Sequence, residues 1–230
     1  NALSVAATTS TDRRSSFANY GTTVDVCAPG SSILSTAYSN TYASWDGTSM
    51  ASPVAAGTVG LIWANHPTWN NTQVATQLVM TTDDINSLNP AYAGLLGSGR
   101  INAYKALTTT PVPLVKYHSH QISDGGNGIA EAGEAVSMLL SLKNWWGDAA
   151  SVTATIHSDD YAVSVTSGYS SFGPLDGGSI ASNAGFAFEV DNTALPHWAR
   201  FTVDITADAQ VRTDTFYVQI ERSPILRVDD

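Results

Sequence analysis

The sequence predicts an α/β domain followed by an all-β antiparallel sandwich, on three observations. Residues 1–8 form a short run of small apolar residues, and residues 54–64 form a helix-length run without a charged side chain. From Leu114 onward, apolar residues recur with a period of two, as in strands. Residues 108–113 between these parts read Thr-Thr-Thr-Pro-Val-Pro, which predicts a stiff linker.

These observations predict domains at 1–109 and 110–222, with residues 223–230 as the start of a further segment. Residues 1–8 read as a central strand of a parallel sheet, whose earlier strands we expect upstream. The remaining elements expected in the first domain are a strand at 22–28, a strand at 33–36, a loop at 39–46, a helix starting near Ser49, a capped amphipathic helix at 70–80 with Val74, Leu78 and Val79 on one face, and a short helix at 101–107.

The second domain reads as strands throughout. About seven strands in roughly 110 residues are typical of an antiparallel β-sandwich. Its clearest strand patterns lie at 135–142, 152–156, 162–165, 185–190, 200–205 and 214–220.

Composition excludes several partners. The chain has 230 residues, 13% of them charged, with a net charge of −10, which argues against nucleic acid and anionic membranes. No apolar run approaches the roughly 20 residues of a membrane span. Its one cysteine, Cys27, can form no internal disulfide, and we interpret it as a small buried hydrophobic residue.

Ser49 is the candidate catalytic residue. It lies in the segment Gly47-Thr48-Ser49-Met50-Ala51-Ser52-Pro53, directly before the uncharged helical run. Unpaired N–H groups and the helix dipole favour negative charge at a helix N-terminus, so a hydroxyl there suits acyl transfer. The alternative is that Ser49 is an ordinary helix cap or loop serine.

The segment 47–53 resembles the nucleophile segment of subtilisin-like serine peptidases. Residues 15–21, 24–30 and 99–106 resemble further segments of this family in the same order, so the resemblance covers about residues 1–107. It implies that the first domain is the C-terminal part of a subtilisin-like parallel-sheet domain. It also implies that Ser49 is the nucleophile of an Asp-His-Ser triad in an endopeptidase, which cleaves protein or peptide substrates and needs no cofactor for the chemistry.

The same resemblance leaves the site incomplete. In the family, the aspartate, histidine and oxyanion-hole asparagine precede the serine by far more than the 48 residues found before Ser49, and no corresponding segment occurs here. We therefore expect a fragment that is inactive alone and whose partner is the missing N-terminal part of the same protein. We expect that protein to be secreted or on the cell surface, with its signal peptide outside this chain.

The family match also predicts substrate contacts. It places Phe17 and Trp45 on the leaving-group side of the cleft, together with Asp46, Gly47 and Thr48 just before the nucleophile. The alternative for both aromatic residues is ordinary packing. The family usually has asparagine where Asp46 stands, which leaves the local hydrogen bonding open.

A second candidate site lies in the loop at 124–134. Asp124, Asn127, Glu131 and Glu134 carry oxygen atoms among glycines, which suits calcium, although the spacing is not that of an EF-hand. The alternative is a solvated hairpin turn. His118 and His120 would share one strand face and could bind a metal, but they lack a clear third ligand.

Two functions follow from these patterns. The first is a secreted endopeptidase with an accessory β-sandwich, similar to the modules that follow secreted bacterial peptidases. The second is a non-catalytic scaffold or binding module that contacts cell-surface glycans or proteins, with Ser49 as a relic. Upstream sequence with or without the aspartate and histidine segments would distinguish them.

Overall fold

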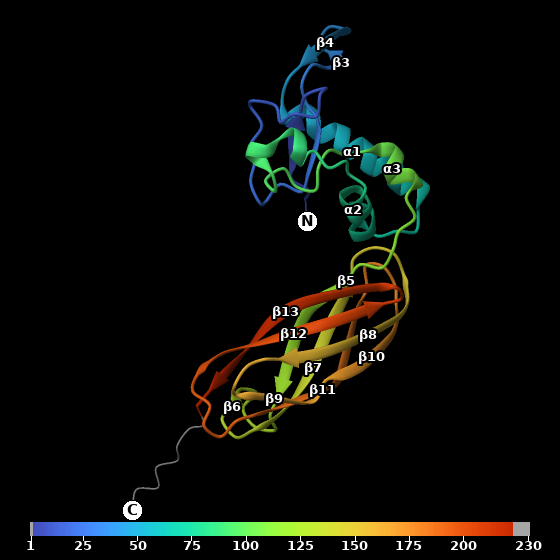
Figure 1. The fold of residues 1–230 in the computed structure, drawn as a ribbon. Helices are drawn as coiled ribbons and strands as arrows, with labels where there is room; N and C mark the ends of the chain where they lie inside the picture. The colour runs from blue at the N-terminus through green and yellow to red at the C-terminus, as the bar shows by residue number, and fades with distance from the viewer. Residues whose placement is uncertain (1, 223–230) are drawn as a thin grey trace, which may run out of the picture. The chain divides into compact units, whose positions relative to one another are not determined.

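The computed structural model describes residues 2–222 and separates the chain into two compact units, which meet between Thr110 and Pro111 (Figure 1). The segment that we expected to begin at residue 223 lies outside the described residues. No helix within residues 2–222 is long and apolar enough to cross a membrane.

The N-terminal unit is built on two parallel strands, β1 (Val5–Thr8) and β2 (Val26–Pro29), with Val5 opposite Val26. Helix α1 (Thr48–Asn65) contacts both strands, and the small side chains at the interface let it approach closely. The core between them consists mainly of alanine and aliphatic residues: Ala7, Ala18, Val26, Ala28, Ala51, Ala55, Ile62, Val74, Leu78, Ile101 and Ala106.

An exposed hairpin precedes α1 and corrects the prediction of a loop at 39–46. Strand β3 (Ile33–Ala37) pairs antiparallel with β4 (Thr41–Trp45) and the two stand away from the rest of the unit (Figure 1). Ser39 and Asn40 turn the chain with φ values of 61° and 58°. The prediction failed because β4 is exposed along most of its length and lacks a buried alternating face.

Two further helices complete this unit. Helix α2 (Asn71–Met80) confirms the helix predicted at 70–80: Asn70 and Gln73 form a reciprocal capping box, and Val74 and Leu78 are buried. Two single-turn helices follow, η1 (Asn86–Leu88) and η2 (Pro90–Tyr92). Helix α3 (Ala103–Thr108) starts two residues later than predicted, because Asn102 is its N-cap and accepts from the Lys105 N–H.

The loop before α3 is fixed by one carboxylate. Asp83 accepts from the Arg100 guanidinium at 2.6 Å, the Asn102 amide at 2.9 Å and the Lys105 ammonium at 2.6 Å. Arg100 also pairs with Asp12 at 3.0 Å. The segment 99–103 that resembles the family ending therefore joins three parts of the chain that are distant in sequence.

Within residues 111–222, the C-terminal unit has nine strands in two sheets (Figure 1). One sheet has the order β10-β8-β12-β13-β6 and the other β5-β7-β11-β9; all pairings are antiparallel except β13 with β6. Both sheets bury side chains in one common core, which includes Met138, Leu140, Phe186, Phe188, Phe201 and Ile205. The strands are β5 (Val115–Ser123), β6 (Ala130–Glu131), β7 (Ala135–Asn144), β8 (Ala149–Ser158), β9 (Val163–Ser167), β10 (Tyr169–Leu175), β11 (Ile180–Val190), β12 (His197–Ala207) and β13 (Gln210–Glu221).

We expected the two histidines of β5 to share one strand face, but they do not. The pairing of β5 with β7 shifts between Tyr117 and Ser119, which leaves His118 unpaired at a bulge. His118 is exposed, whereas His120 is partly buried and packs against Phe216. The bulge is what breaks the two-residue alternation on which the metal hypothesis depended.

Candidate active site

Ser49 is the second residue of α1 and is exposed to solvent. Gly47 is the N-cap, and its carbonyl accepts hydrogen bonds from the N–H groups of Met50 (3.0 Å) and Ala51 (3.3 Å). Neither the Ser49 N–H nor its hydroxyl has a hydrogen-bond partner among residues 2–222. The positive end of α1 therefore presents an unused donor and an unused hydroxyl at the same residue.

The start of α1 is held against the end of β2 by two glycines. The Gly47 N–H donates to the Gly30 carbonyl at 2.8 Å. A Cβ at Gly30 would lie only 2.6 Å from the Cβ of Ala7 and 2.8 Å from the Gly47 oxygen, so no larger residue fits there. Gly47 itself has a φ of 158°, close to extended backbone. This contact fixes where Ser49 stands relative to the sheet.

Asp46 completes the connection before the nucleophile segment. Its Oδ1 accepts the Ser32 N–H at 2.6 Å and so ties the segment to the beginning of the β3–β4 hairpin. An asparagine Oδ1 would accept the same hydrogen bond. The hydrogen bond to the Ser32 N–H is therefore made by the carboxylate of Asp46.

Among the described residues of the N-terminal unit, no histidine lies next to Ser49. The one histidine of this unit, His66, is the C-cap of α1, at the opposite end of the helix from Ser49. The His66 ring stacks on Trp69 at 3.7 Å and contacts the Asn65 amide at 3.2 Å.

Pro53 lacks the N–H that would otherwise bond the Ser49 carbonyl, so the first turn of α1 is less constrained than an interior turn.

Four of the five residues predicted to contact substrate are exposed, and Gly47 is partly buried. Phe17 is exposed in the loop after β1, and Trp45 is exposed at the end of β4. No ring contact joins Phe17 to Trp45 among the described residues. Thr48 is exposed as the first residue of α1, beside Gly47.

Two residues that the sequence did not single out support the Phe17 loop. The Arg14 guanidinium bonds the carbonyls of Ser16 and Ala18 and lies 4.4 Å from the centroid of the Tyr92 ring. The buried Asn89 accepts the Arg14 N–H at 2.8 Å. The contacts of Arg14 with Asn89 and Tyr92 span 75 or more residues, and their only signal in the sequence is the Asn-Pro pair at Asn89.

Comparison with known proteins identifies this unit. Residues 1–102 match the profile of the Subtilase family. This match covers most of the N-terminal unit, which we call the subtilase unit. Subtilisin BL from Lederbergia lenta is 42% identical over 106 residues, which are 46% of this chain and 38% of that protein.

Two further relatives are similar to this chain over about the same length. Thermitase from Thermoactinomyces vulgaris is 45% identical over 107 residues, which are 46% of this chain and 36% of thermitase. An extracellular protease from Xanthomonas campestris is 44% identical over 115 residues, which are 47% of this chain and 20% of that protein. The chain thus spans well under half the length of the curated relatives that it matches.

Helix α1 of the subtilase unit carries no charged residue, yet only one side of it is covered. Ala51, Ala55, Thr58 and Ile62 are buried along that side. On the others, Leu61 is 51% exposed and Trp63 is 44% exposed. A helix that is apolar all round is normally buried all round, so this surface is incompletely covered.

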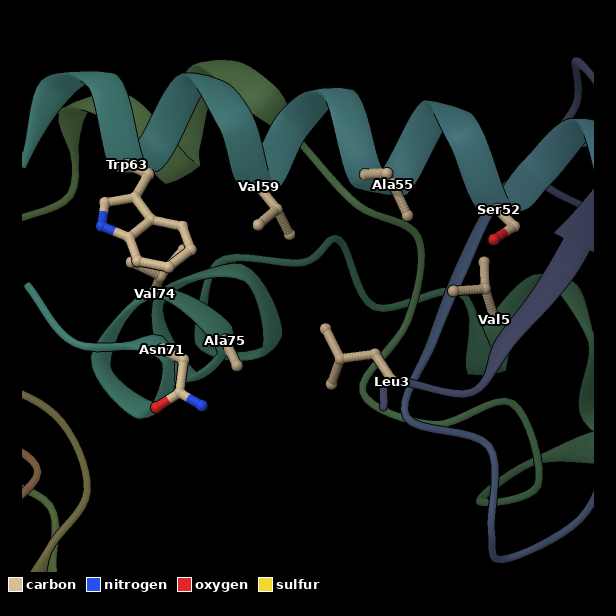
Figure 2. Close-up of a pocket in the computed structure, with 10 residues that line it drawn as sticks. Leu3, Val5, Ser52, Ala55, Val59, Trp63, Asn71, Val74 and Ala75 are labelled. Carbon is tan, nitrogen blue, oxygen red and sulfur yellow. The ribbon is translucent and has the colours of Figure 1, made fainter. Parts of the chain in front are cut away.

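A hollow of about 320 Å³ lies along this helix, between α1, α2 and the residues at the start of β1. Figure 2 shows Val59, Trp63 and Ala55 of α1 directed toward it from one side, and Leu3 from the other. Ser49 is not among the residues that line it. The hollow is therefore a packing surface next to α1, separate from Ser49.

The candidate calcium loop closes on its own hydrogen bonds. Asp124 Oδ1 accepts the N–H groups of Gly126 (2.8 Å) and Gly128 (3.0 Å), and these bonds hold the pKa of its carboxyl below the usual value. The Asn127 amide donates to Glu131 Oε1 at 3.1 Å. Glu134 Oε2 accepts the Glu131 N–H at 2.9 Å.

These contacts bring Asn127, Glu131 and Glu134 to one end of the loop. Asp124 Oδ2 is buried and accepts no hydrogen bond from residues 2–222, so one carboxylate oxygen of the correct chemical type is left without a donor. Within the same residues, no group of three or more His, Cys, Asp or Glu side chains is arranged to hold a metal ion. The loop therefore offers calcium an oxygen donor without a formed cage.

Proposed function

We propose that this chain supplies the nucleophile-bearing part of a serine endopeptidase of the subtilisin type. The observation that carries the proposal is Ser49, an exposed serine with a free hydroxyl at the N-terminus of α1, inside a unit of the subtilase family. Of the catalytic groups of a subtilisin-type site, this chain provides the Ser49 hydroxyl and N–H, so the proposed complete site requires additional polypeptide.

In the proposed mechanism, Ser49 Oγ attacks the carbonyl carbon of the scissile peptide bond. A histidine base supplied by the additional polypeptide takes the hydroxyl proton and passes it to the leaving amine. The Ser49 N–H, free in this structure, donates to the oxyanion, and an asparagine of the additional polypeptide provides a second donor. Water then hydrolyses the acyl-enzyme at the same serine.

The exposed side of α1 supports the proposal of additional polypeptide. Parallel sheets occur almost only with both faces covered, and β1 and β2 form a sheet of only two strands. The hollow lined by Leu3, Val59 and Trp63 would be filled by apolar side chains of the missing part (Figure 2). Burial of such a surface stabilises by about 25 cal/mol per Å² and would favour association of the two parts.

We propose that the leaving-group side of the substrate binds beside the β3–β4 hairpin. Trp45 ends β4 four residues before Ser49, and Phe17 lies in the loop held by Arg14. Asp46, Gly47 and Thr48 connect this hairpin to the nucleophile. Because Asp46 uses Oδ1 for the Ser32 N–H, its charge is held near the leaving group and should favour basic residues there.

We also propose that the parent protein is secreted and that the C-terminal unit is an accessory β-sandwich. A relative of the subtilase unit is named an extracellular protease. The two sheets of the C-terminal unit share one core, and this unit is compact in itself, as expected of an independent module.

The proposal is tested by completing the domain. The part of thermitase that precedes its 107 matched residues is joined ahead of residue 1 of this chain, and hydrolysis of a peptide anilide is measured. We expect turnover in the chimera, loss of at least about 1000-fold in its Ser49→Ala variant, and no turnover in the present chain alone.

A folded chimera without Ser49-dependent turnover would contradict the enzyme proposal. Folding is checked by cooperative thermal unfolding, and Ser87→Ala serves as the control because Ser87 is exposed in η1 and does not line the hollow. In that case the alternative, a scaffold or binding module with Ser49 as a relic, would be the better account.

We propose, separately, that calcium orders the loop at 124–134 through Asp124 Oδ2 with Asn127, Glu131 and Glu134. Calcium in excess of its dissociation constant raises the melting temperature, because it binds only the folded loop. The expected result is a rise at about 5 mM calcium that is absent in Glu134→Ala and retained in Glu189→Ala, an acidic residue of β11. No shift at millimolar calcium would contradict the proposal.

A further inference from the structure

A hollow of about 350 Å³ opens on the C-terminal unit, where β5 and the residues just before β6 approach the outer side of β13. Its volume is within the range of small-molecule sites. The residues that give it chemical character are His120, Ile129, Trp198, Tyr217, Gln219 and Glu221.

Two aromatic rings on the outer face of the sheet form one wall. Trp198 of β12 is 62% exposed and Tyr217 of β13 is 52% exposed. Trp198 pairs with Gln219 and Tyr217 with Arg200, so the two rings are diagonal neighbours on adjacent strands. Large exposed rings beside a hollow form an apolar platform for a ligand. Unlike a long flexible side chain, a ring loses little conformational freedom when a ligand covers it.

Both hydrogen-bond donors and hydrogen-bond acceptors face the same hollow. Gln219 donates through its amide nitrogen to Glu221 Oε1, which leaves the Gln219 carbonyl oxygen and the second Glu221 oxygen as acceptors. Tyr117 OH lies 2.7 Å from His120 Nδ1. In the tautomer in which Tyr117 donates, His120 Nε2 carries the proton and is a donor. Burial lowers the pKa of His120, which keeps the ring neutral at pH 7.

The charges select among ligand classes. Among residues 2–222, no lysine or arginine lines the hollow but Glu221 does, and the chain has a net charge of −10, so anionic ligands are disfavoured. A neutral sugar matches the remaining features. Its C–H face covers an aromatic ring, while each hydroxyl can both donate to Glu221 or Gln219 and accept from His120.

We propose that this hollow binds a neutral oligosaccharide, with Trp198 and Tyr217 as the stacking platform and Gln219, Glu221 and His120 as the hydroxyl-binding groups. The site belongs to the C-terminal unit and does not depend on the chemistry proposed for Ser49. It would place the chain on a glycan surface.

The test measures binding of cellohexaose, chitohexaose and maltohexaose to the full chain by titration calorimetry. We expect at least one to bind with a dissociation constant on the order of 10 µM to 1 mM, weakened at least about tenfold in Trp198→Ala. Tyr169→Ala is the matched control, because Tyr169 is also 62% exposed but lies on β10, outside the hollow. Cooperative unfolding of each variant verifies its fold.

A cationic ligand is the competing occupant, since aromatic rings and a carboxylate also bind cations. Choline and a pentalysine peptide are therefore titrated alongside the sugars, and Glu221→Gln separates the two. That variant keeps a hydroxyl-binding amide and should retain sugar binding within about fivefold, whereas cation binding would be lost. Binding of choline or pentalysine alone, equal sugar binding by Trp198→Ala, or no binding of any hexasaccharide at about 5 mM overturns the proposal.

Discussion

Ser49 and His66 lie at opposite ends of the same helix, about 25 Å apart along the axis of α1. A general base must be within hydrogen-bond reach of the proton that it removes. We therefore predict that His66→Ala in the active chimera changes kcat/KM by less than about twofold, whereas Ser49→Ala removes turnover. Loss of activity in His66→Ala with an unchanged melting temperature would show that the histidine acts in the reaction.

The Asp46–Ser32 hydrogen bond gives a second prediction. Asp46→Ala leaves the Ser32 N–H without its acceptor and should lower the free energy of unfolding by about 1 kcal/mol, measured by denaturant titration. Asp46→Asn retains an Oδ1 acceptor and should stay within about 0.5 kcal/mol of the parent. Equal destabilisation by both variants would mean that the carboxylate charge matters more than the hydrogen bond.

Glycines near the nucleophile give a matched pair. Gly30→Ala places a methyl group 2.6 Å from Ala7 Cβ and should destabilise by about 1–3 kcal/mol. Gly57→Ala, in the middle of α1 with open space around it, should stabilise the chain by about 0.5–1 kcal/mol through helix propensity. Thermal unfolding of both variants tests the close approach of α1 to β1; a neutral Gly30→Ala would contradict it.

Much of the secondary structure was predictable where a local signal and burial agreed. The helix at 70–80 followed from the Asn70 cap and the periodic Val74 and Leu78, and all three take those roles. Strand β4 was missed because its hairpin is exposed, so the sequence carries no buried alternation there. The bulge at His118 was also missed, since nothing local distinguishes an inserted residue from a regular strand position.

The site was predictable only where residues are close in sequence. The segment 47–53 placed Ser49 at a helix N-terminus, and the structure has it there. The Asp46–Ser32 bond and the Arg14–Asn89 bond join residues 14 and 75 positions apart, and both depend on the fold bringing separate loops together. Contacts of this kind have no signature in a single sequence.

Asp83 provides a prediction of pH dependence. The hydrogen bond and charge of Lys105, with the Asn102 amide and the Arg100 charge, lower the pKa of Asp83 below its ordinary value. The stabilisation from this carboxylate is therefore present above about pH 4 and is lost as the pH falls through the lowered pKa. Asp83→Asn should reduce the melting temperature at pH 7 and flatten its decline between about pH 5 and pH 2. If the melting temperature of Asp83→Asn declined at acidic pH as steeply as that of the parent, this role would be contradicted.

Cys27 is predicted to be chemically inert in the folded chain. It is fully buried, its Sγ contacts the Leu96 carbonyl at 3.4 Å, and burial raises the pKa of its thiol to about 11. Ellman's reagent at pH 8 should react only after denaturant is added. Because the folded state favours the neutral thiol, stability should fall as the pH rises above about 8.5 toward 11, and this loss should be absent in Cys27→Ala.

We propose that Ser49 is a nucleophile of the subtilisin type whose base lies outside this chain. The most direct measurement is labelling of the purified chain by a fluorophosphonate probe at mildly basic pH, with Ser49→Ala as the control and the active chimera as the positive reference. We predict labelling of the chimera and none of the chain alone. Ser49-dependent labelling of the chain alone would contradict the account, because a base would then be supplied from within these 230 residues.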